Sequence, residues 1–106
     1  MNLTDEQIKT AFTEAKLAAQ ALAETPDKGA SNFDTVTLAH GMKNRKLASL
    51  AGKCGLYAHT SRWCGCSHVF INFSTGGADR RTKMNEAAMN SLTESGIAAS
   101  MYYQRD

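Results

Sequence analysis

The residues best suited to chemistry are three cysteines and two histidines that lie between positions 54 and 68. Thiolate and neutral imidazole are the ligands that zinc takes in closed, tetrahedral structural sites. A hairpin with Ser61 opposite Cys66 would place the two histidines opposite each other and on the same face as Cys66, with Cys64 at the turn, so that four ligands could converge. The residues of this candidate zinc site are His59, Cys64, Cys66 and His68.

The same residues have two other interpretations. There is no C-x2-C pair, and Cys64 and Cys66 share a strand face at this spacing without any metal, as partly buried thiols beside histidines that hydrogen-bond across strands. Alternatively, one cysteine is a nucleophile activated by an imidazole. The sequence around the cysteines matches neither a cysteine-protease signature nor a nucleophile elbow. We therefore expect no enzyme, and no cofactor beyond a structural zinc ion.

A glycine-rich segment with arginines, at positions 76–81, lies between a predicted strand and a predicted helix. Free amides at that helix start, together with Arg80, Arg81 and Lys83, would suit a phosphate or an acidic side chain. The segment is neither a Walker loop nor a dinucleotide fingerprint. The alternative is an ordinary strand-to-helix turn that needs flexible glycines.

Basic residues are interleaved with aromatic ones over the middle of the chain. Segment 43–83 carries eight Lys or Arg against one acidic residue, whereas residues 1–40 carry three basic against six acidic ones. Such a surface can follow a nucleic-acid backbone while Tyr57, Trp63 or Phe70 stacks on bases. The alternative is a solvated surface that the acidic first helix neutralises. The candidate binding residues are Arg45, Lys46, Arg62, Trp63, Arg80, Arg81 and Lys83.

The chain has 106 residues, of which 42% are hydrophobic and 21% charged, and this length and composition suit one hydrophobic core. We therefore expect a single domain over residues 1–106, and the order of its predicted elements indicates the α+β class. Periodicity and capping signals predict helices, and alternation predicts strands that are joined by a four-residue loop over 62–65. Segment 34–38 is compatible with the start of a helix or with a short strand. The predicted helices are 4–24, 43–51 with Gly52 as the stop, and one that ends near Ser95 and Gly96; the predicted strands are 55–61, 66–74 and 97–103.

We expect a small sandwich in which two or three helices cover one face of a three- or four-stranded sheet. Period-two alternation sends Leu56, Ala58, Val69, Ile71 and Phe73 to the covered face, and Tyr57, His59, Cys66, His68, Phe70 and Asn72 to the other. The second face is thus a candidate binding surface.

The composition and these patterns predict a non-catalytic module that binds nucleic acid or a nucleic-acid-containing assembly. The alternative is a stand-alone adaptor or inhibitor that engages an acidic protein surface through the same residues. No apolar run approaches the length of a spanning helix, and no secretory signal is recognisable, so we expect a cytoplasmic protein without a membrane partner.

Overall fold

The computed structural model describes residues 2–104, and this part of the chain forms three α-helices and one four-stranded sheet. The predicted α+β class is confirmed. In this range no helix has both the length and the apolar character needed to cross a membrane. In chain order the elements are α1 (Asp5–Gln20), β1 (Thr35–Leu38), the short 3-10 helix η1 (Gly41–Lys43), α2 (Asn44–Lys53), β2 (Tyr57–Trp63), β3 (Cys66–Asn72), α3 (Ala78–Glu94) and β4 (Ser100–Tyr102).

The sheet has the strand order β2-β3-β1-β4, and every neighbouring pair is antiparallel. After α1, the chain therefore follows a β-α-β-β-α-β path, the split β-α-β connectivity. The strands β3 and β4 run in the same direction with β1 between them. This order places β2 and β4, which come from distant parts of the chain, at the two outer edges.

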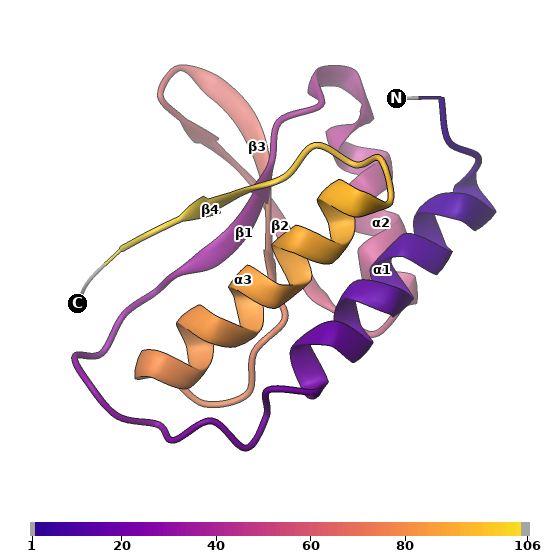
Figure 1. The fold of residues 1–106 in the computed structure, drawn as a ribbon. Helices are drawn as coiled ribbons and strands as arrows, with labels where there is room; N and C mark the ends of the chain where they lie inside the picture. Colours follow the sequence, from indigo (N-terminus) through magenta and orange to yellow (C-terminus); the bar gives the residue numbers. More distant parts are fainter. Residues whose placement is uncertain (1, 105–106) are drawn as a thin grey trace.

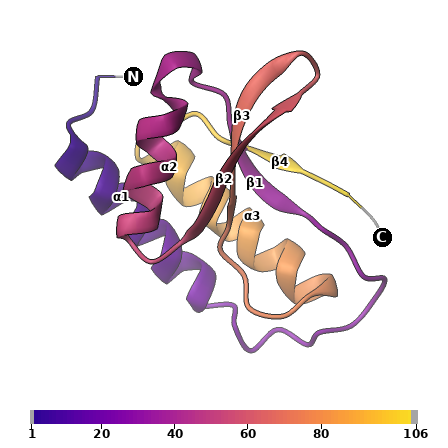
Figure 2. The ribbon, with the colours of Figure 1, turned by 180° about the vertical axis from the view of Figure 1, so that it is seen from behind.

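The helices cover one face of the sheet, as predicted. In Figures 1 and 2, α1 and α3 lie side by side in that helical layer, and the closed end of the β2–β3 hairpin extends away from it. Alternation along the strands turns Val36, Val69 and Ile71 toward the helices, where Phe12 and Met84 meet them in a core from which solvent is excluded. Within residues 2–104 the opposite face carries no helix, so its side chains are not covered by that layer.

The first helix begins where its capping signal predicts. Thr4 accepts a hydrogen bond from the Gln7 amide at 3.1 Å, and the Gln7 side chain accepts one from the Thr4 amide at 2.9 Å, which completes a capping box. The helix ends at Gln20 rather than near position 24, because the chain tightens into turns in which Leu22 N–H donates to Ala19 and Thr25 N–H donates to Leu22.

The other boundaries differ from the predicted ones by a few residues. Segment 35–38 is a strand that is buried throughout, which resolves the ambiguity there. The second helix passes through Gly52, and the chain leaves it at Gly55, which has a φ of +79°. The last strand covers only 100–102 of the predicted 97–103.

The predicted hairpin register was wrong by two residues. Trp63, not Ser61, lies opposite Cys66, because the loop consists only of Cys64 and Gly65. Both loop residues have positive φ, +53° and +80°, as a tight two-residue hairpin turn requires. A shift of two residues keeps every side chain on its predicted face.

Candidate functional site

Six rings form a continuous layer on the uncovered face of the sheet, which we call the aromatic face. Phe70 is its floor: it is 8% exposed, stacks on His59 with ring centroids 5.5 Å apart, and meets Tyr102 edge-on at 5.4 Å. Tyr102 in turn meets Trp63 edge-on at 4.9 Å. The members of the aromatic face are Tyr57, His59, Trp63, His68, Phe70 and Tyr102.

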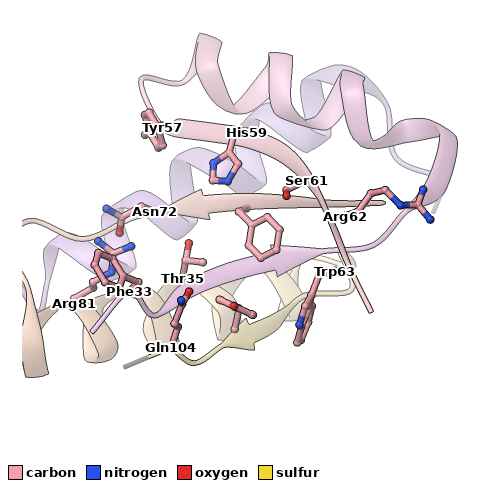
Figure 3. A pocket seen from close by; sticks show the side chains of 12 residues that line it. Phe33, Thr35, Tyr57, His59, Ser61, Arg62, Trp63, Asn72, Arg81 and Gln104 are labelled. Atoms are coloured by element: carbon pink, nitrogen blue, oxygen red, sulfur yellow. The ribbon is translucent and has the colours of Figure 1, made fainter. Parts of the chain in front are cut away.

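Five of the six rings, all except His68, line a concave pocket of about 570 Å³. That volume lies within the range of about 300–1,000 Å³ typical of small-ligand sites. The residues described that line it include Arg62 and Arg81 but no Asp or Glu. Figure 3 shows Asn72 and Arg81 together at one end of the pocket and Trp63 at the other. The pocket thus has an apolar floor, with Arg81 at one end and, near the other, Arg62, whose guanidinium turns away toward the hairpin turn (Figure 3).

Three of the seven predicted binding residues, Arg62, Trp63 and Arg81, line this pocket. The Arg62 side chain is held against the hairpin turn, because its Nη2 donates to the Gly65 carbonyl at 2.8 Å. Trp63 is 36% exposed, so part of its ring is accessible to a ligand. Burial lowers the pKa of Arg81, while the negative charge of Asp34 opposes that effect; an arginine remains protonated at neutral pH in either case.

The other four predicted binding residues do not line this pocket. Arg45 and Lys46 belong to α2 in the helical layer, and Lys46 forms an ion pair of 2.7 Å with Asp5 of the acidic first helix. Arg80 donates through Nε to the carbonyl of Thr25 at 2.8 Å, and Lys83 is exposed on α3.

The start of α3 is covered by the loop that follows α1. The Gly77 amide donates to an oxygen of Asp27 at 3.3 Å, and the Asp79 amide donates to the carbonyl of Lys28 at 2.9 Å. These two amides already have partners within the chain, which fits the alternative interpretation of the segment as a strand-to-helix turn. Gly76, with a φ of +82°, provides the backbone conformation for that turn.

The structure does not bring the four predicted zinc ligands together. The observed register puts His59 opposite Phe70 instead of His68, and the His68 Nδ1 lies 3.0 Å from the Thr37 hydroxyl. Within residues 2–104, no three His, Cys, Asp or Glu side chains are placed to hold a metal ion. Cys64 and Cys66 are both exposed, so the alternative of partly buried thiols was wrong for them. The cross-strand contact predicted for the histidines is confirmed for His68.

Apart from Arg81, sequence reasoning missed the pocket residues that come from outside the hairpin. The alternation of side chains in β4 is the signal that identifies Tyr102, because its neighbour Met101 faces the helices. Phe33 and Gln104 have no periodic signal, and they meet because the Phe33 amide donates to the Gln104 carbonyl at 2.6 Å. Thr35 was missed because its segment was not assigned as a strand.

Comparison of the chain with protein-family models, with curated proteins and with solved structures finds no match. Its function must therefore be inferred from the side chains of the aromatic face and their surroundings.

Proposed function

We propose that the protein is a non-catalytic binding module that takes single-stranded nucleic acid on the aromatic face. The observation that supports this most strongly is a continuous layer of rings in a pocket that Arg62 and Arg81 help to line, with no carboxylate among its lining residues in the range 2–104. Unstacked bases bind aromatic side chains whatever their sequence, and arginines hold the phosphates that connect them. A duplex keeps its bases stacked inside and offers no such contact.

An uncovered four-stranded sheet is a surface that RNA-binding modules use for base stacking. Here the rings come from β2, β3 and β4, whereas β1 contributes Thr35 and Thr37 to this face. Tyr57 at 72% exposed and Trp63 at 36%, together with the exposed His59, are rings that a base can reach directly. Phe70 is nearly covered and supports the rings around it.

The test is fluorescence anisotropy with labelled single-stranded DNA and RNA of about ten nucleotides, titrated at several salt concentrations. We expect Trp63→Ala to weaken binding by about tenfold, since one base stack contributes about 1–3 kcal/mol. Arg62→Ala should weaken binding of every sequence and lower the salt slope by about one. Arg45→Ala removes the same charge from α2 and is the matched control that should leave affinity unchanged.

Failure of every oligonucleotide to bind, or affinity that does not change with salt, would overturn the proposal. Binding that Arg45→Ala weakens as much as Arg62→Ala would move the interface to the helical layer. A stoichiometric protein complex that requires Trp63, without any oligonucleotide binding, would select the adaptor or inhibitor alternative.

A further inference from the structure

The side-chain amide of Asn72 is held in one orientation at the end of the pocket away from Trp63. Its Oδ1 accepts three hydrogen bonds, from the Ser74 amide at 3.0 Å, the Ser74 hydroxyl at 2.7 Å and the Asn85 Nδ2 at 3.0 Å. A backbone amide can only donate, so the Ser74 contact identifies that atom of Asn72 as the oxygen. Within the part of the chain described, the Asn72 Nδ2 has no protein acceptor, and Asn72 lines the pocket.

Arg81 is fixed at the same end of the pocket. Its Nε donates to the Asp34 carbonyl at 2.7 Å, so the guanidinium is anchored, while its terminal nitrogens have no hydrogen-bond acceptor among residues 2–104. The Asp34 carboxylate is already engaged: its two oxygens accept from the Gln104 amide at 2.8 Å and from the Thr82 hydroxyl at 2.6 Å.

One buried carboxamide links the two donors. Asn85 has no exposed surface, and its Nδ2 lies 3.0 Å from both the Asn72 Oδ1 and the Arg81 carbonyl. Its Oδ1 accepts from the Phe73 amide at 2.8 Å, which fixes its own orientation. The positions of Asn72 and Arg81 are therefore set before any ligand arrives, and little ordering remains to oppose binding.

We infer that Asn72 and Arg81 form a phosphate subsite, which takes one phosphate of the single strand whose bases lie on the aromatic face. This inference rests on the proposed function and adds the placement of the strand. Both groups only donate, and an asparagine that reads adenine must donate and accept together. The Asn72 Oδ1 already accepts three hydrogen bonds within the protein, so it is not available to accept one from an adenine. Phosphate oxygens accept from both donors, and a guanidinium binds them in fork geometry.

The probe is a thymidine trinucleotide, which is too short to shift far along the protein and offers no guanine edge to Arg81. Its affinity is measured with a 5′-phosphate, with a 3′-phosphate, and with either internal linkage replaced by an uncharged methylphosphonate. We expect that removal of one particular phosphate weakens binding about tenfold. Whether that phosphate is terminal or internal shows which position of the strand occupies the subsite. The other phosphates should matter several-fold less.

Two variants connect that phosphate to the subsite. Asn72→Asp keeps an oxygen acceptor for Ser74 and Asn85 but replaces the free donor by a carboxylate oxygen, so it should weaken binding about tenfold or more and abolish dependence on the critical phosphate. Arg81→Lys keeps the positive charge but removes the two parallel donors of the guanidinium, so we expect a smaller loss of affinity than for Asn72→Asp. Asn90→Asp makes the same charge change at an exposed position of α3 and should bind normally.

The outcomes separate the subsite from the proposed function. If both subsite variants bind every probe as the wild type does while Trp63→Ala still loses affinity, the subsite is refuted and the aromatic face stands. If a guanine at one position restores the affinity lost with the phosphate, Arg81 reads a base edge and the subsite is also refuted. If the wild type binds none of the probes or the longer strands, both proposals fail. Urea unfolding of Asn72→Asp shows whether a loss of binding reflects a loss of fold, and Arg81→Lys tests the subsite independently.

Discussion

The buried carboxamide of Asn85 should be a main determinant of stability, and Asn85→Ala tests this directly. The substitution removes the acceptor of the Phe73 amide, and an orphaned buried donor costs about 1–3 kcal/mol. The Asp34 and Arg81 carbonyls each lose the hydrogen bond from Asn85, at a smaller cost in free energy. The Asp34 carbonyl keeps its bond from the Arg81 Nε, and the Arg81 carbonyl lies in a helix. Vacating a fully buried site adds about 1 kcal/mol. We therefore expect a loss of about 2–4 kcal/mol from a total that is typically about 5–15 kcal/mol for a domain.

Urea denaturation followed by the fluorescence of Trp63 measures this loss, since the ring lies against His68 and Tyr102 only in the folded state. The midpoint should fall with no change in the slope of free energy against urea. Asn90→Ala is the matched control, because it gives the same gain in helix propensity at an exposed position of α3. If Asn85→Ala lies within about 0.5 kcal/mol of that control, the Asn85 network does not stabilise the fold as argued.

Three further predictions concern single residues. Thr4→Ala should cost about 0.5–2 kcal/mol in urea unfolding because it removes the capping box, and an unchanged midpoint would contradict this. Cys64→Asn should raise stability by a few tenths to about 1 kcal/mol, since asparagine tolerates the left-handed conformation before Gly65, and a lower midpoint would show that the thiol has a packing role. A hydrogen bond of 2.5 Å to Glu86, with burial and that carboxylate's charge adding to it, raises the pKa of Tyr103 to about 12. The stability from this contact is thus fully present below the unfolded pKa of about 10 and is lost as the pH rises through about 12. The ultraviolet difference titration of wild type against Tyr103→Phe should show that midpoint, and Glu86→Ala should return it toward 10.

The two faces of the sheet were predictable because side-chain alternation depends only on strand period. The register was not, because the turn needs positive φ at Cys64, and cysteine does not signal that conformation as asparagine or glycine does. The observed register, two residues away from the predicted one, removes the convergence of His59 and His68 on which the zinc hypothesis depended. It left Tyr57 and Phe70 on the predicted surface.

The predicted binding residues separated for a different reason. Charge along the chain does not reveal which cations find partners in the fold: Lys46 pairs with Asp5, and Arg80 donates to the loop after α1. Only Arg62 and Arg81 of the predicted cations line the pocket. The Asn72 donor also escaped prediction as a hydrogen-bonding group, since one of the three contacts that hold its side chain comes from Asn85, thirteen residues away in the chain.

The contact between Trp63 and Tyr102 joins the two outer strands of the sheet across its open face. The hairpin is still tied to the rest of the fold at Ser67, whose carbonyl accepts a hydrogen bond from the Asn44 Nδ2 at 2.9 Å, and at His68, which contacts Thr37. Within residues 2–104, only the closed end, residues 62–66, is held by its own ladder, its turn contact and the rings alone. We therefore expect that closed end to open locally at a lower free-energy cost than the unfolding of the core. The pocket therefore has a floor on the packed sheet, at Phe70, and one side formed by the closed end of the hairpin, which we expect to move more easily. If it binds a ligand as proposed, we expect it to discriminate strictly by the chemistry of the ligand and weakly by its length.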